Sequence, residues 1–102
     1  MRAFGALADP TRAEIVARLA QRERTVNELV QLFPISQPAV SKHLRILREA
    51  GLVSVEASGR KRVYRLETEP IQEIDRWLER YRALWAKRLD ALEAHMDEEE
   101  SR

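Results

Sequence analysis

The chain has 102 residues, of which 44% are hydrophobic, with 18 Lys plus Arg against 17 Asp plus Glu. This length predicts one compact domain, and the absence of cysteine excludes disulfides, thiolate metal sites and reactive thiols. No stretch is long and apolar enough to span a bilayer, and the first residues lack the apolar run of a signal peptide. We therefore expect a cytoplasmic protein without membrane contact.

The net charge of +1 conceals an uneven distribution along the chain. Residues 36–65 carry seven basic and two acidic side chains, a balance of +5. Residues 66–102 carry six basic and eleven acidic side chains, a balance of −5. Such asymmetry says more about binding partners than the total does. On charge alone, a nucleic-acid-binding surface and an ordinary solvated face are equally good interpretations.

The first third of the chain predicts three short helices, of which residues 2–8 form the first. Asp9-Pro10 begins the second helix, because Asp is a favourable N-cap and Pro suits the first helical position. Thr25 and Glu28 form a capping box that begins a third helix over residues 25–33. We expect its inward positions to be Val26, Leu29, Val30 and either Leu32 or Phe33.

A fourth helix is predicted over residues 36–50, with Ser36 as its N-cap. Val40, Leu44 and Leu47 recur at helical spacing and predict one buried stripe. Only a short connection separates this helix from the third one. The two helices are therefore typical of a helix-turn-helix.

A β-hairpin is predicted over residues 52–66, with strands over 52–56 and 61–66 and a turn over 57–60. A hairpin directly after a helix-turn-helix is typical of the winged-helix fold. We therefore predict a mainly α winged helix-turn-helix domain over residues 1–96, with about five helices and a two-stranded wing. Residues 97–102 form an acidic C-terminal tail in this interpretation.

A long helix is predicted from Thr68 or Glu69 to the acidic run Asp97–Glu100, where we expect it to fray. In its middle turns, apolar side chains span over half of the circumference, which is more than one domain core covers. A two-fold dimer through this helix and residues 2–8 is the simplest explanation. The alternatives are a helix packed only on its own domain and an apolar ligand pocket between the tryptophans. The predicted dimer interface consists of Phe4, Leu7, Trp77, Leu78, Tyr81, Leu84, Trp85, Leu89 and Leu92.

The outer side of the helix over 36–50 carries side chains that can read double-stranded DNA. Gln bonds adenine in a bidentate manner, Ser pairs with either base edge, and Lys or Arg reads guanine or phosphate. The basic hairpin tip would reach the flanking backbone or minor groove, and Thr25 with its helix amides would hold a phosphate. We assign DNA binding to Thr25, Ser36, Gln37, Pro38, Ser41, Lys42, Arg45, Arg60, Lys61 and Arg62.

The sequence gives little support for an enzyme active site or a metal site. Ser41 and His43 cannot form a catalytic pair, because residues two apart on a helix point in different directions. With no Gly-rich phosphate loop and no paired carboxylates, we predict no enzymatic activity, no cofactor and no metal site. We expect His43 to pack inside the domain, and a weak metal site at His95 with Asp97–Glu99 is a minor alternative. The sequence identifies no small-molecule effector.

Five segments of the chain form a recognisable pattern, namely Ala6-Leu7-Ala8-Asp9-Pro10-Thr11-Arg12, Thr25-Val26-Asn27-Glu28-Leu29, Ser36-Gln37-Pro38-Ala39-Val40-Ser41-Lys42-His43-Leu44, Leu47-Arg48-Glu49-Ala50-Gly51-Leu52-Val53 and Gly59-Arg60-Lys61-Arg62-Val63-Tyr64. Together they resemble the ArsR-type (ArsR/SmtB) winged helix-turn-helix repressors over nearly the whole chain, from residue 2 to residue 96. The resemblance implies a homodimeric bacterial transcriptional repressor whose first and last helices form the dimer interface. It also implies that the helix from Gln37 enters the major groove while the wing flanks it, with Gln37, Pro38, Ser41 and Lys42 nearest the bases.

The chain departs from the metal-sensing members of that family. Where they carry paired cysteines on the third helix, this sequence has Asn27–Leu32, and its last helix lacks the spaced His and carboxylate ligands of the zinc sensors. The resemblance therefore implies a branch of the family that does not sense metals. The remaining alternative is a winged-helix protein-interaction module that does not read DNA sequence and docks through its acidic tail or aromatic helix.

Overall fold

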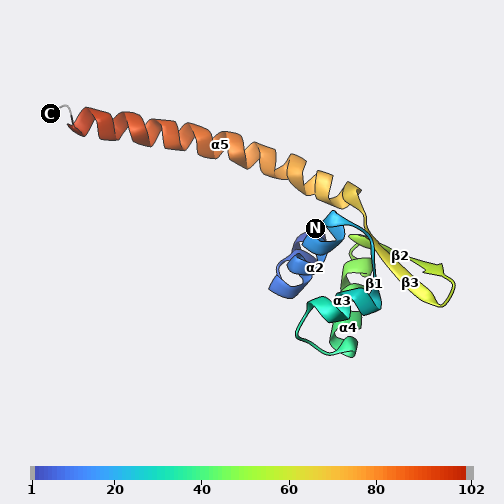
Figure 1. Ribbon diagram of the computed structural model, residues 1–102. Helices are drawn as coiled ribbons and strands as arrows, with labels where there is room; N and C mark the ends of the chain where they lie inside the picture. Colours follow the sequence, from blue (N-terminus) through green and yellow to red (C-terminus); the bar gives the residue numbers. More distant parts are fainter. Residues whose placement is uncertain (1, 101–102) are drawn as a thin grey trace. The chain divides into compact units, whose positions relative to one another are not determined.

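The computed structural model describes residues 2–100, which belong to two units. The first unit extends to Ile71, and the second begins at Gln72 and is helical throughout its described part. In chain order the elements are α1 (Arg2–Leu7), α2 (Pro10–Gln21), β1 (Arg24–Thr25), α3 (Val26–Leu32), α4 (Gln37–Glu49), β2 (Val53–Ser58), β3 (Lys61–Leu66) and α5 (Thr68–Glu100) (Figure 1).

The helices of the first unit begin at the caps that the sequence predicts. The Asp9 carboxylate accepts a hydrogen bond from the Arg12 backbone N–H at 3.0 Å, which is the main reason that the pKa of Asp9 is lowered. Thr25 and Glu28 form both halves of the predicted capping box at α3. Ser36 accepts from the Ala39 N–H at 3.3 Å at the start of α4. All three predicted helix starts are confirmed.

The core of the first unit centres on the stripe predicted for α4. Val40, Leu44 and Leu47 are completely buried, as is Leu29 of α3. The sequence left Leu32 and Phe33 as alternatives, and Leu32 is 39% exposed whereas Phe33 is half-buried. Phe33 follows Leu29 by four residues and so lies closer to its face of the helix. The remaining core side chains of this unit are Ala3, Ala6, Ile15, Val16, Leu19, Leu52, Val53 and Tyr64.

The wing is longer than the sequence predicts, because its turn is shorter. β2 and β3 pair antiparallel up to Ser58 opposite Lys61, so only Gly59 and Arg60 connect them. The predicted turn over 57–60 is therefore wrong by two residues. Gly59 has a φ of +63°, which a two-residue hairpin turn requires and glycine adopts without strain. Figure 1 shows the hairpin projecting from the helices of the first unit.

The sheet also contains a third strand that the sequence did not predict. β1 pairs antiparallel with β3, which gives the strand order β1-β3-β2. Its two residues lie opposite Tyr64 and Val63. Because β1 directly precedes α3, this pairing holds the beginning of α3 beside the wing.

The long helix α5 has 33 residues and continues through Asp97–Glu100, where the sequence predicted fraying. An ion pair between His95 and Glu99, four residues apart at 3.1 Å, supports this last turn. Large apolar side chains are exposed along the helix, including Trp85 at 59%. None of the helices within residues 2–100 is long and apolar enough to cross a membrane.

Candidate nucleic-acid interface

Two hollows in the surface of the first unit contain nearly all the residues predicted to bind DNA. The first, which we call the α3–wing hollow, measures about 510 Å³. It lies between the beginning of α3, the beginning of α4 and the tip of the wing. Its lining residues are Thr25, Val26, Asn27, Glu28, Gln37, Arg60, Lys61 and Arg62.

The second, which we call the α4–β3 hollow, measures about 500 Å³ and has no acidic side chain in its lining. It follows the outer side of α4 and is bounded by strand β3. Arg62, near the tip of the wing, lines both hollows and therefore lies between them. The lining residues are Pro38, Ser41, Lys42, Arg45, Arg48, Arg62 and Tyr64.

The predicted site residues are thus divided between two neighbouring surfaces rather than lying on one. The structure brings Thr25, Gln37 and the wing tip together in one hollow, and it brings Ser41, Lys42 and Arg45 together in the other. Ser36 lines neither hollow, and its hydroxyl caps α4. The cap fixes where α4 begins and therefore which side chains its first turn presents.

Three cations of the first unit differ from those that line the two hollows, because a glutamate lies beside each of them. Arg18, Arg22 and Arg65 each form an ion pair with a glutamate. Among the described residues, no acidic side chain forms an ion pair with any cation of the two hollows. These six cations are Lys42, Arg45, Arg48, Arg60, Lys61 and Arg62. An unpaired cationic surface of this kind attracts a polyanion such as nucleic acid.

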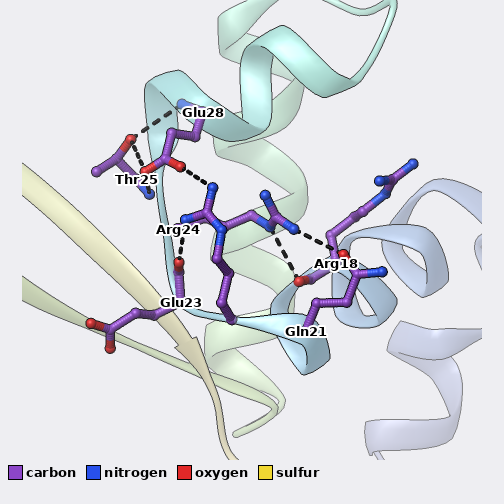
Figure 2. Close-up of polar contacts among 7 residues, drawn as sticks. Arg18, Gln21, Glu23, Arg24, Thr25 and Glu28 are labelled. Carbon is purple, nitrogen blue, oxygen red and sulfur yellow. Dashed lines mark hydrogen bonds and ion pairs between the residues drawn. The ribbon is translucent and has the colours of Figure 1, made fainter.

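Glu28 is the one acidic residue that lines the α3–wing hollow, and it is neutralised locally. Arg22 Nη2 donates to its carboxylate at 2.6 Å, and this hydrogen bond is the main reason that the pKa of Glu28 is lowered. The Thr25 N–H and hydroxyl also donate to the carboxylate, each at 3.2 Å. Figure 2 shows Glu28 turned toward Thr25. The Thr25 hydroxyl therefore caps α3, and Glu28 lies where the sequence placed a phosphate.

Arg24, which precedes the cap, holds this corner of the unit together. Its side chain is buried, at 9% exposure, and no carboxylate accepts from it among the contacts of residues 2–100. Instead, Nε donates to the Arg18 carbonyl oxygen at 3.2 Å and Nη2 donates to Gln21 Oε1 at 2.9 Å (Figure 2). A cation at the carboxyl end of α2 is stabilised by the free carbonyl groups there. Arg24 thus joins α2 to β1 and positions the cap of α3.

His43 of α4 faces the beginning of α2 rather than the outer surface. Its Nδ1 atom lies 3.4 Å from Arg12 Nη1 and 4.0 Å from the Asp9 carboxylate. Arg12 also donates from Nε to the Ala6 carbonyl oxygen at 2.7 Å. The prediction that His43 packs within the domain is confirmed, and its contacts connect α4 to α1 and α2.

Five residues that line the hollows were not among the predicted DNA-binding residues, namely Val26, Asn27, Glu28, Arg48 and Tyr64. Arg48 follows Ser41 by seven residues and therefore lies on the same side of α4, a signal that helical periodicity contains. The sequence interpretation did not assign Arg48 to DNA binding. Tyr64 carried no such signal, because its place depends on how β3 packs beside α4.

The described residues form no cluster of metal ligands. Within residues 2–100, no three His, Cys, Asp or Glu side chains are arranged to hold a metal ion. His95, the minor metal candidate, pairs with Glu99 instead.

Comparisons with known proteins converge on one family. The family model described as "Bacterial regulatory protein, arsR family" matches residues 9–55. The HTH-type transcriptional regulator Rv2034 of Mycobacterium tuberculosis is 40% identical over 98 residues, which cover 96% of this chain and 89% of that protein. The HTH-type transcriptional repressor SmtB of the same species is 51% identical over 61 residues, which cover 60% of this chain and 45% of that protein.

Solved structures agree with these sequence matches. The crystal structure of an ArsR family transcriptional regulator has a TM-score of 0.75 at 35% identity, covering 83% of this chain and 93% of that one. An ArsR-like transcriptional regulator from Rhodococcus sp. RHA1 has a TM-score of 0.72 at 36% identity, covering 89% of this chain and 86% of that one.

Proposed function

Because this chain belongs to the ArsR family of bacterial regulatory proteins and is a DNA-binding transcriptional regulator, we propose that it is a homodimeric repressor that reads an inverted repeat. The family consists of transcriptional regulators, and the chain is a regulator rather than an enzyme. Since bacterial chromosomal DNA lies in the cytoplasm, the repressor acts there.

The observation that carries the proposed DNA-binding mode is the set of unpaired cations around α4 and the wing. The α4–β3 hollow has four cationic side chains and no acidic one, which suits a phosphate backbone that passes between α4 and β3. The first turn of α4 enters the major groove, where Gln37 and Ser41 reach base edges. The wing tip then contacts the backbone or the adjacent minor groove through Arg60, Lys61 and Arg62.

Dimerisation supplies the second half of the proposed binding site. The exposed apolar side chains of α5 provide an interface that a second copy covers. The predicted interface residues Phe4 and Leu7 belong to α1 and are part of the same proposal. Two-fold symmetry of the protein then matches an inverted repeat in DNA, with the two α4 helices about 34 Å apart, one turn of the double helix.

The alternative function, a protein-interaction module that does not read DNA sequence, is not favoured. An adaptor would gain nothing from six unpaired cations on one surface, because their mutual repulsion lowers stability unless a polyanion is bound. The relatives of this chain described above are named as transcriptional regulators or repressors, which supports the same conclusion.

A mobility-shift measurement with genomic DNA fragments tests the proposal. We expect a shift whose affinity falls by about 10³- to 10⁵-fold between about 50 and 200 mM salt if six to ten phosphates are contacted. At a preferred site, Lys42→Ala should cost about 1–3 kcal/mol if this side chain makes a good base contact. Lys87→Ala removes the same charge from α5 and serves as the matched control. Equal effects of the two variants would argue against a reading role for α4.

A further inference from the structure

Tyr64 of β3 is a core side chain that also lines the α4–β3 hollow. Only 7% of the residue is exposed, and it lies opposite Val55 of β2 and Arg24 of β1 on the central strand of the sheet. Within residues 2–100 the Tyr64 hydroxyl makes no hydrogen bond, and no side-chain oxygen that is sealed from solvent there lacks a partner. The hydroxyl is therefore the exposed end of a buried side chain, and the hollow is the surface that this residue lines.

The alternation of side chains along β3 places Tyr64 on the same face as Arg62. Successive side chains of a strand point to opposite faces, so Arg62 and Tyr64 share one face while Val63 and Arg65 share the other. Arg62 and Tyr64 both line the α4–β3 hollow, whereas Arg65 lies outside it with two glutamate partners. The unpartnered hydroxyl therefore lies on the face of the wing whose cation has no carboxylate partner among the described residues.

A stripe along one side of α4 forms the facing wall of this hollow. Its members are separated by three, four and three residues, which is helical spacing, and they extend for about 15 Å along the helix. The stripe consists of Pro38, Ser41, Arg45 and Arg48.

Arg48 lies at the end of the hollow that is nearest Tyr64. The carboxyl end of α4 leads into Val53, the first residue of β2, so this end of the helix lies at the base of the wing. Leu66 pairs with Val53 at that base, and Tyr64 is only two residues from Leu66. Gln37, at the other end of α4, shares the α3–wing hollow with the wing tip instead. Arg48 and Tyr64 are thus the cation and the hydroxyl of one end of the α4–β3 hollow.

The side chains of the α4–β3 hollow can all donate hydrogen bonds, apart from Pro38. Lys and Arg have donors and no acceptor, and the hydroxyl groups of Ser41 and Tyr64 can donate as well. An occupant of the hollow must therefore supply negative charge and several acceptor oxygens, as a phosphate of nucleic acid does. Because the Tyr64 ring is packed in the core, its hydroxyl is already held in place and loses little conformational entropy on binding.

We propose that the Tyr64 hydroxyl donates a hydrogen bond to one phosphate of the DNA backbone and that Arg48 neutralises the same phosphate. The contact is independent of base sequence and holds the backbone at the base of the wing, beside the carboxyl end of α4. This inference rests on the DNA-binding mode proposed above, and it adds an uncharged donor that the charge pattern does not reveal.

Tyr64→Phe tests the proposal, because it removes the hydroxyl and keeps the packing of the ring. Affinity for a duplex of random sequence should fall by about three- to tenfold, the effect of one lost hydrogen bond. The slope of log affinity against log salt should remain that of the parent chain, because a neutral hydroxyl releases no counterion. Arg48→Ala should also weaken binding, but it should reduce this slope by about one. If Tyr64→Phe binds DNA as tightly as the parent chain, the proposal is overturned.

Ser54→Ala is the matched control, because it removes a hydroxyl from the other face of the same sheet. Ser54 lies opposite Arg65 in the register and lines neither hollow, so its loss should change neither the affinity nor the slope. Urea unfolding of the variants provides a second readout. Tyr64→Phe should be as stable as the parent chain, because its hydroxyl has no partner to lose within residues 2–100. A loss of affinity accompanied by a matching loss of stability would make the role of Tyr64 structural and would overturn the proposal.

A double variant tests whether Tyr64 and Arg48 hold the same phosphate. If they do, Tyr64→Phe should weaken binding less in the Arg48→Ala background than in the parent chain, because side chains that share a partner are coupled. Independent losses would place the two side chains on different phosphates and would overturn the shared contact. A parent chain that binds no DNA would contradict the proposed function as well. A parent chain that binds DNA as expected, with Tyr64→Phe indistinguishable from it, would contradict only this inference.

Discussion

The cations of the first unit differ in whether a carboxylate is near them, and this difference supports the proposed DNA-binding surface. Arg65 of β3 pairs with Glu23 at 3.3 Å and Glu56 at 2.9 Å. Arg62, three residues earlier on the same strand, has no such partner among the described residues and lines both hollows. Sequence reasoning identified Arg62 from the basic turn, but it could not tell which cations the fold would pair.

Arg62 and Arg65 therefore offer a matched comparison on one strand. Arg62→Ala should weaken binding to all DNA sequences similarly and reduce the slope of log affinity against log salt by about one, because one phosphate contact is lost. Arg65→Ala should leave the slope unchanged. The measurement is a salt titration of DNA affinity for both variants. An unchanged slope in Arg62→Ala would remove this residue from the phosphate contacts.

Glu28 contributes stability through its charge, so its contribution depends on pH. The Arg22 side chain and the Thr25 backbone hold the pKa of Glu28 below its unfolded value. The stabilisation is present above the unfolded pKa and is lost as the pH falls through the folded pKa. Glu28→Gln should therefore lower the free energy of unfolding at pH 7. The difference from the parent chain should shrink as the pH falls below the unfolded pKa of about 4.3, and it should disappear once the pH is below the lowered pKa of the folded chain.

Urea unfolding of both chains at several pH values measures this difference. Asp9 also has a lowered pKa, but it is present in both chains and does not affect the comparison. If the difference persists unchanged at low pH, Glu28→Gln destabilises the chain through lost packing or lost hydrogen bonds rather than through the lost charge.

At the level of elements, the helices were predictable and the finer details of the sheet were not. Asp9, Thr25 and Ser36 are capping residues whose effect is local, and all three helices begin where these residues predict. β1 has only two residues and exists because the fold places it beside β3, which no local pattern encodes. Gly59 marked the wing turn correctly, but its length depended on pairing across the hairpin.

The stripe of α4 should dominate the stability of the first unit. Leu44 is completely buried, and its replacement by Ala leaves a cavity that costs about 2–5 kcal/mol. Leu32 of α3 is partly exposed, so Leu32→Ala should cost much less and serves as the control. Urea denaturation of both variants checks the prediction. Similar losses would show that the core is not centred on α4.

For the whole molecule, the net charge of +1 is small because the balance of +5 over residues 36–65 and the balance of −5 over residues 66–102 cancel. The sequence contained this division, the helix-turn-helix and the wing, so the family and the location of the candidate site were predictable. The separation of the site into two hollows was not, because it depends on the packing of β3 beside α4.

Selection of binding sites from random double-stranded DNA decides whether a dimer of this chain reads DNA through α4. We expect an enriched inverted repeat whose half-sites lie one helical turn, about 10 base pairs, apart from centre to centre. Gln37→Ala should relax the preference within each half-site without changing their spacing. A selection that returns no enriched sequence, or a single half-site bound by one copy of the chain, would contradict a dimer that reads DNA through α4.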